Sequence, residues 1–376
     1  MLRVALVAVA GLLVAISFAC VPPPNAPPTL GVAAARVRLN AVPTCSSDGK
    51  PFLSHVQLLS SGYDPGKNFS GSAPGIAGTP IDPNSLYAAA LQNAFAFAPP
   101  QLQTRLCNLN GIYVNGPVSC NTTACLSGAW GYRAFNANSQ KYIAIPAALW
   151  NLGCPGASEY AYHCYESDLL NTVVRWGTAN PSPPQYAPAN VDTLDMTVLA
   201  ALAHEVGHIV WYEVFNPRNP GRDYDPNNSN FCGGRFFVNS WESRVHKPPQ
   251  WRGLGDRNQG STGPDKHLIA PQISDVDRAI RTGAVTLALT DLDQLYQPSQ
   301  PWATYLGAIS PDEDFVETFK FWVLTNAQSG KVSGDGPLTS LPIQFVAGSG
   351  ENIPQAFVNS SKTALAAKVS CIGQII

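Results

Sequence analysis

The chain has 376 residues, of which 45% are hydrophobic and 13% are charged, and its formal net charge is -2. This length is ample for one large domain or two small ones with a sizeable core. A near-neutral chain without a long basic run lacks the electrostatic footprint of a nucleic-acid-binding protein, so we expect no nucleic-acid partner. The 33 prolines and 31 glycines indicate many ordered loops rather than a helical bundle.

Residues 1–20 have the layout of a secretory signal peptide. Arg3 supplies a positive charge, and Val4 to Ala19 is almost wholly apolar but shorter than the ~20 residues of a membrane-spanning helix. The stretch SFAC, which ends at Cys20, loosely resembles a bacterial lipobox, in which the cysteine carries lipid. Plain cleavage near Ala19 and an uncleaved anchor helix are the alternatives. We therefore expect a protein that is secreted or held in the periplasm or cell envelope, and that meets a membrane only through its signal or a lipid on Cys20.

The cysteine content agrees with export. Nine cysteines occur, and removal of Cys20 with the signal segment leaves an even number. In an exported chain this predicts four disulfide bonds. Cys120 with Cys125 and Cys154 with Cys164 are close enough for local pairs, whereas the sequence does not define the pairing of the other four cysteines.

The pattern of the chain predicts mixed helix and strand first and mostly helix later, with both halves sharing one core. A Pro-rich tether over 21–44 leads into a folded domain that we place at 45–376. The expected elements are a helix over Asn84–Phe97 ended by Pro99 and Pro100, short strands in GIYVNG, GAWGYRAF and KYIAIP, a helix over Glu159–Trp176, a long apolar helix capped by Asp192, helices over Asp275–Tyr296 and Pro311–Ala327, and an irregular tail after Ser329.

The long apolar helix contains the stretch LAALAHEVGHIVWYEV, from Leu199 to Val214, with three ionisable residues in its middle. His204 and His208 are four residues apart, so both imidazoles lie on one helix face and can ligate the same ion. Glu205 lies about 100° further round the helix, where it can reach a water on that ion without ligating the ion itself. The opposite side is apolar and is expected to pack into the core, through Leu199, Leu202, Val206 and Ile209.

Gly207 predicts a close contact with another element, and the ionisable residues also fit an explanation without a metal. Gly207 costs about 1 kcal/mol relative to alanine in a helix interior, so we expect another element to approach the helix closely there. The alternative to a metal site is a helix with two hydrogen-bonded core histidines and a Glu205 paired to lysine or arginine, which would need several buried partners.

The stretch HEVGH resembles the H-E-x-x-H signature of the zincin metallopeptidases. The metzincin branch is excluded, because Trp211 and Val214 stand where that branch has Gly and His. The thermolysin-like branch places a glutamate about twenty residues after H-E-x-x-H, and this chain has none there. SPDEDFVETF, from Ser310 to Phe319, is instead similar to the E-x-F-x-E helix of lethal factor-like gluzincins. By this resemblance Glu313 is the third zinc ligand and Glu317 orients a ligand histidine.

The resemblance implies an α+β, zincin-like metallopeptidase fold, with an edge strand of a small sheet over the active-site helix and a mostly helical C-terminal half. It implies one Zn²⁺ per chain, held by His204, His208 and Glu313 with water in the fourth position. Glu205 is then the general base, and Tyr305 stabilises the oxyanion. The implied activity is that of a zinc-dependent hydrolase, a protease that binds a peptide or protein substrate along the edge strand, for which GAWGYRAF and KYIAIP are the candidates.

Several roles stay open. Glu313 also fits position N3 of a capping box that starts at Ser310, in which its carboxylate would point back at its own backbone. Glu317, and Glu242 in NSWESR, are the other candidates for the third ligand, and Tyr305 fits equally well as a packing aromatic. The other histidines have no ligand partner at a useful spacing and are expected to be ordinary surface or loop residues: His55, His163, His246 and His267.

Two other functions stay open as well. The first is a catalytically silent, metal-stabilised envelope or binding protein on the same scaffold, against which the presence of a general base argues. The second is hydrolysis of a non-peptide amide by the same residues. The oligomeric state does not follow from the sequence.

Overall fold

The computed structural model describes residues 42–59, 78–116, 123, 126, 129–133, 140–173, 185–214, 303–304, 307, 311–328, 336–344, 351–352 and 363–376. They belong to one compact unit over 36–376. The expected signal peptide, most of the tether and the helix expected over Asp275–Tyr296 lie outside the described residues, as do Tyr305 and Glu242. A search of the described helices finds none that is long and apolar enough to cross a membrane.

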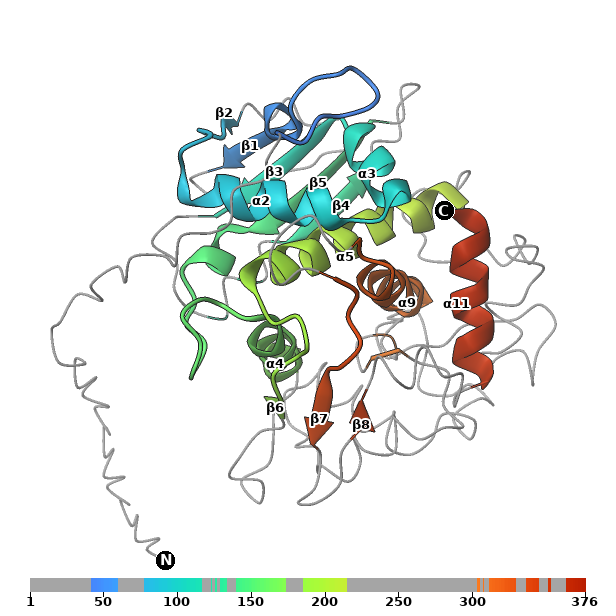
Figure 1. The fold of residues 1–376 in the computed structure, drawn as a ribbon. Coiled ribbons are helices and arrows are strands. Elements are labelled where there is room, and N and C mark those ends of the chain that lie inside the picture. Colours follow the sequence, from blue (N-terminus) through green and yellow to red (C-terminus); the bar gives the residue numbers. More distant parts are fainter. Residues whose placement is uncertain are drawn as a thin grey trace, which may run out of the picture. The chain divides into compact units, whose positions relative to one another are not determined.

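A five-stranded mixed sheet forms one layer of the fold (Figure 1), with the strand order β2-β1-β3-β5-β4. Its centre is parallel and consists of β1 (Val56–Leu59), β3 (Gly111–Asn115) and β5 (Lys141–Pro146). Its two edges are antiparallel and consist of β2 (Thr79–Pro80) and β4 (Trp130–Arg133). Every residue of β3 is buried, and so is every residue of β5 after Lys141, as is usual for parallel strands inside a sheet.

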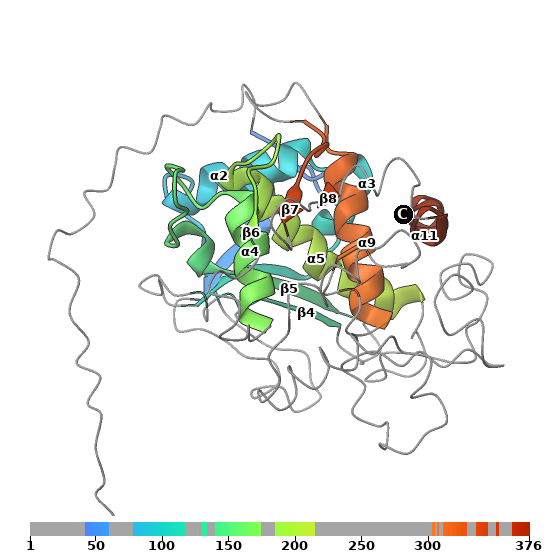
Figure 2. The same ribbon diagram turned by 90° about the horizontal axis from the view of Figure 1, so that it is seen from below.

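The helices pack around one long central helix, α5 (Leu194–Val214), which contacts α2, α9, β4 and β5. Figure 2 shows α5 running between α4 and α9. The other helices among the described residues are α2 (Leu86–Phe97), α3 (Pro100–Cys107), α4 (Tyr162–Val173), α9 (Pro311–Thr325) and α11 (Thr363–Ile375), with 3-10 turns η1 (Phe52–His55) and η3 (Ala147–Trp150). A small second sheet joins β6 (Gln185–Tyr186), β7 (Pro342–Gln344) and β8 (Glu351–Asn352) in that order. The α+β class expected from the sequence is therefore confirmed.

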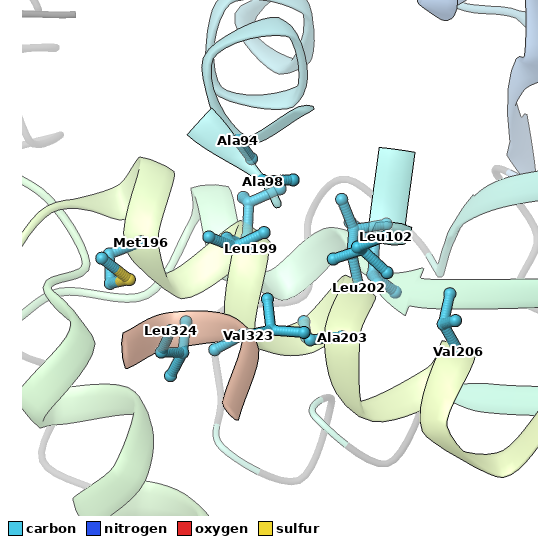
Figure 3. Packing of buried hydrophobic residues seen from close by; sticks show 14 of the residues in the cluster. Ala94, Ala98, Leu102, Met196, Leu199, Leu202, Ala203, Val206, Val323 and Leu324 are labelled. Carbon is cyan, nitrogen blue, oxygen red and sulfur yellow. The ribbon is translucent and has the colours of Figure 1, made fainter. Parts of the chain in front are cut away.

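The apolar side of α5 forms the middle of the core, as its 3.6-residue pattern predicts. Leu199, Leu202 and Val206 are at most 1% exposed, and Ile209 is 2% exposed. Figure 3 shows this side packed against α9 and against the segment that joins α2 to α3. Full burial of one large aliphatic side chain contributes about 1.5–3 kcal/mol, so this row of side chains is a main reason why α5 lies at the centre.

The predicted helices over Asn84–Phe97, Glu159–Trp176 and Pro311–Ala327 correspond to α2, α4 and α9. One helix was not predicted, and one expectation, about the tail of the chain, was wrong. A new helix, α3, starts at Pro100, because proline fits the first helical position, whose N–H has no partner within the helix. The tail after Ser329 was expected to be irregular, but it contributes β7, β8 and the thirteen-residue α11.

The start of α5 also differs from the expectation. Asp192 was expected to cap this helix, but Thr193 does so: its hydroxyl accepts the backbone N–H of Met196 at 3.2 Å. The carboxylate of Asp192 instead accepts the backbone N–H of His163 in α4 at 2.9 Å. Either side chain can serve as a cap, and the packing of α4 against the start of α5 decides between them.

The two candidates for the edge strand are distinguished by the sheet order. GAWGYRAF contains β4, which among the described residues pairs with β5 alone and is therefore an edge of the sheet. KYIAIP is β5, which lies between β3 and β4. Since both sides of β5 are already paired, its backbone has no free edge for another strand, and its expected role as an edge strand is corrected.

Two disulfide bonds occur among the described residues. Cys154 bonds to Cys164, which confirms this predicted local pair, and Cys45 bonds to Cys107. The latter joins residues 62 positions apart, and no local pattern in the sequence predicts it. The predicted pair of Cys120 with Cys125 lies outside the described residues.

Two glycines allow close contacts around the middle of α5. A β-carbon on Gly207 would lie 3.2 Å from the Cα of Val316, so the expected close approach at this glycine is made by α9. A β-carbon on Gly131 of β4 would lie only 2.6 Å from the carbonyl oxygen of Glu205 and 3.0 Å from Cβ of His208. The edge strand thus touches α5 at the turn that carries the motif.

We predict that Gly131→Ala lowers the free energy of unfolding by about 1–3 kcal/mol, because the added methyl group meets backbone that cannot rotate away. Urea denaturation measures this change. Gly153→Ala is the matched control, since a β-carbon there meets no atom within 4 Å, and its stability should stay close to wild type. Equal stability of both variants would contradict the close contact of β4 with α5.

Candidate metal centre

Three side chains from two helices converge where α5 crosses α9. His204 and His208 of α5 have ring centroids 5.0 Å apart. Glu313 of α9 places one carboxylate oxygen 3.7 Å from Nε2 of His204 and the other 3.8 Å from Nε2 of His208. One ligand atom from each of the three residues lies within 4.8 Å of the other two. The side chains are 15%, 16% and 26% exposed, so the group lies at the boundary between core and solvent.

The spacing of this group fits a tetrahedral ion. Ligand atoms at about 2.0–2.1 Å from such an ion lie roughly 3.4 Å apart. The two observed separations, 3.7 and 3.8 Å, run to different oxygens of Glu313, and the three ligand atoms lie within 4.8 Å of one another, so the group must contract to hold an ion. Two imidazoles and one carboxylate are also a common donor set for catalytic zinc.

Glu313 is the third residue of α9, the position that a capping box requires. Its carboxylate nonetheless lies against the two imidazoles. The structure thus places Glu313 beside His204 and His208, whereas Ser310, the expected cap, lies outside the described residues.

Glu317 lies one helical turn after Glu313 and contacts His204 on the side of the imidazole that faces away from Glu313. Its Oε1 is 2.9 Å from Nδ1 of His204, the nitrogen that faces away from Glu313. A carboxylate in this place fixes the orientation and the tautomer of the imidazole, so that Nε2 carries the free electron pair toward an ion. Both carboxylate oxygens of Glu317 are thus directed away from the three converging ligand atoms.

A chain of buried charges holds Glu317 in turn. Its Oε2 accepts hydrogen bonds from Thr304 Oγ1 at 2.5 Å and from Lys320 Nζ at 2.8 Å. Lys320 Nζ also donates to Glu166 of α4 at 3.0 Å. Lys320 and Glu317 are completely buried, and Glu166 is 4% exposed. The network therefore links α4, α9 and, through His204, α5.

The charges in this network follow from their neighbours. Burial alone would raise the pKa of Glu317, but the ammonium of Lys320 and the hydrogen bond to His204 outweigh it and hold the pKa well below its usual range. Burial would lower the pKa of Lys320, yet the carboxylates of Glu166 and Glu317 raise it. Both groups are therefore charged, and each depends on the other for that charge.

Glu205 follows His204 directly and is only 4% exposed. Burial would lower the pKa of His204, but the hydrogen bond that its imidazole donates to Glu317 and the charges of Glu313 and Glu205 together raise it. Such a concentration of negative charge around two imidazoles also favours a bound cation.

Sequence reasoning missed Lys320, Glu166 and Thr304. The sequence contains one indication that Lys320 pairs with Glu317. Lys320 stands inside the apolar run FKFWVL, three residues after Glu317 and on the same helix face. Glu166 and Thr304 have no comparable signal, since only tertiary packing brings them to Glu317.

The reading of His163 as an ordinary surface or loop residue was wrong. This residue lies in the first turn of α4, with a side chain that is 13% exposed. Its Nδ1 is 2.6 Å from Asp192, and its Nε2 faces the sulfur atoms of Cys154 and Cys164. One ligand atom from each of these three residues lies within 4.8 Å of the other two, and the two sulfurs are bonded to each other as a disulfide.

Comparison of the chain with protein-family models, with curated proteins and with solved structures returned no match. Its function is therefore inferred from the residues and their arrangement.

Lys320→Met should lower the free energy of unfolding by about 3–5 kcal/mol, because it leaves two buried carboxylates without their cation. Thermal or urea denaturation measures the loss. Lys50→Met is the control: its side chain is 69% exposed and its ammonium lies 3.7 Å from Asp48, and an exposed pair contributes about 0–1 kcal/mol. Similar losses in the two variants would show that the Lys320 network does not stabilise the fold.

Proposed function

We propose that the chain is a zinc-dependent metallopeptidase of the zincin type, similar to the gluzincins. The observation that carries this proposal is the convergence of His204, His208 and Glu313 from two crossing helices, with Glu317 behind one imidazole. Glu205, one residue after the first histidine, supplies the general base that a purely structural zinc site does not need. The α+β fold, with an edge strand against the motif helix, supports the same proposal.

Each residue has a distinct task in the proposed reaction. His204, His208 and Glu313 hold one Zn²⁺, and Glu317 keeps Nε2 of His204 directed at it. The zinc supplies Lewis acidity, which lowers the pKa of a water molecule and polarises the scissile carbonyl. Glu205 accepts the proton of the attacking water and passes it to the leaving amine as the C–N bond breaks.

The proposed substrate is a peptide bound in extended form along β4. This strand is an edge of the sheet and touches α5 at the turn that contains Glu205 and His208. An extended peptide can add to such an edge by backbone hydrogen bonds, which is a sequence-tolerant mode of binding. It would lie beside the ligand face of α5, as cleavage requires.

An exported location is part of the proposal. The N-terminal pattern predicts a signal peptide, with a lipid on Cys20 or cleavage beside it as the two outcomes. The disulfides Cys45–Cys107 and Cys154–Cys164 are compatible with an extracellular or periplasmic protein.

Glu205→Gln should keep about one zinc per chain but lower peptidase activity by about 10²–10⁴-fold, because glutamine cannot carry the proton. Zinc is measured by elemental analysis and activity on unfolded casein. Near wild-type hydrolysis by this variant would remove Glu205 from the mechanism. A zinc-containing wild type that cleaves no peptide and no small amide would instead favour the silent-scaffold function.

Zinc content after dialysis against a mild chelator should separate the two glutamates of α9. Glu313→Ala removes one of three ligands and should empty the site under conditions that spare the wild type. Glu317→Ala removes an orienting hydrogen bond and should weaken zinc binding by only about 10–100-fold. Glu213→Ala is the control, since this α5 residue pairs with Arg105 and Lys141 and should keep its zinc. Zinc retained in Glu313→Ala and lost in Glu317→Ala would reverse the two roles.

A further inference from the structure

A second cluster of metal-ligating side chains lies at the start of α4 and shares no residue with the first. Nε2 of His163 is 3.5 Å from Sγ of Cys154 and 3.4 Å from Sγ of Cys164. The two cysteines form a disulfide, and both are at most 9% exposed. The proposed peptidase reaction uses none of these groups.

His163 is held in place as a metal-binding histidine is. Its Nδ1 is 2.6 Å from Oδ2 of Asp192, and the other oxygen of Asp192 accepts the backbone N–H of His163 at 2.9 Å. A carboxylate bound at Nδ1 leaves the electron pair on Nε2, which is the nitrogen that faces both sulfurs. Neither the disulfide nor the core requires a histidine oriented in this way.

The distances fit zinc ligation by the reduced cysteines. In a tetrahedral site, a nitrogen at about 2.0–2.1 Å and a sulfur at about 2.3 Å from the ion lie roughly 3.6 Å apart. His163 Nε2 already has nearly this separation from each sulfur. Only the distance between the two sulfurs must increase, from the ~2 Å of a disulfide bond to roughly 3.8 Å between two ligands of the same ion.

The position of Cys164 favours the thiolate that a metal needs. Cys164 is the third residue of the twelve-residue α4. The backbone N–H groups and the dipole of a helix N-terminus stabilise negative charge on a group placed there. Two thiolates and an imidazole are ligands that suit zinc.

We propose that Cys154, Cys164 and His163 form a second zinc site that exists only when the disulfide is reduced. A low-molecular-weight thiol or a dithiol protein reductant breaks the Cys154–Cys164 bond. The two thiols of the reductant supply two electrons and two protons and leave as a disulfide. Binding of Zn²⁺ then displaces two protons from the cysteine thiols into solvent, and oxidation of the pair releases the ion.

Cobalt provides a selective probe of this site in the full-length mature chain. After treatment with a phosphine reductant and its removal without air, Co²⁺ should produce the near-ultraviolet charge-transfer absorption of a thiolate complex. His204, His208 and Glu313 contain no sulfur, so the first centre contributes nothing to this signal. If the first centre does not bind metal, the chain therefore binds less metal in total, while the thiolate absorption stays the same. The oxidised chain should lack the signal.

Matched variants locate the signal. Cys154→Ser with Cys164→Ser should abolish it, and Asp192→Asn should weaken cobalt binding by about 10–100-fold, because the imidazole loses its orienting carboxylate. Cys45→Ser with Cys107→Ser, which removes the other disulfide among the described residues, should keep it. A signal that survives the loss of Cys154 and Cys164 would overturn the proposal.

Alkylation of the reduced chain tests the site without depending on absorption. Zn²⁺ added at one equivalent beyond that held by His204, His208 and Glu313 should protect Cys154 and Cys164 from alkylation, measured peptide by peptide by mass spectrometry, and should leave Cys45 and Cys107 reactive. Equal reactivity of all four in the presence of zinc would overturn the proposal, including the case in which reduction unfolds the chain. Failure of the reductant to open the Cys154–Cys164 bond in the folded chain would overturn it too, since the site then never forms.

Discussion

The candidate centre depends on one buried carboxylate, that of Glu317. A carboxylate with no solvent exposure is stable in its charged form only when cations and hydrogen-bond donors surround it. Lys320, Thr304 and His204 supply these partners, and each approaches from a different direction. The charge of Glu317 thereby controls the orientation of His204, and with it the direction in which Nε2 can bind an ion.

The same interaction constrains the packing of three helices. Lys320 extends from α9 to Glu166 of α4, while Glu317 of α9 reaches His204 of α5. Close contact is possible because Gly207 lets the backbone of α9 approach α5. A second buried pair, Asp314 with Lys368, connects α9 to α11. α9 therefore presents Glu313 to the two histidines from a helix held by buried charges on several sides.

The strong local patterns in the sequence predicted much of the fold. Apolar residues at helical spacing identified α5 and its buried side, and the alternation ended by Pro146 identified β5. Predictions from weaker patterns were wrong where tertiary packing determines the local structure. The tail holds α11 because its apolar residues, such as Leu365 and Ile372, join the common core, although the isolated segment carries few helix signals. Thr193 rather than Asp192 caps α5, because Asp192 is bound to His163 across the interface with α4.

By itself the sequence determined that His204, Glu205 and His208 share one helix with a buried opposite side, because helical periodicity places residues four apart on one face. It also placed Glu313 and Glu317 one turn apart, through the same geometry. Only the tertiary structure decided which carboxylate faces which nitrogen, because that choice depends on the crossing of α5 and α9. It likewise decided that Lys320 pairs with Glu166 of α4 as well as with Glu317, because no periodic pattern links positions so far apart in the sequence. It also decided that His163 faces the Cys154–Cys164 disulfide.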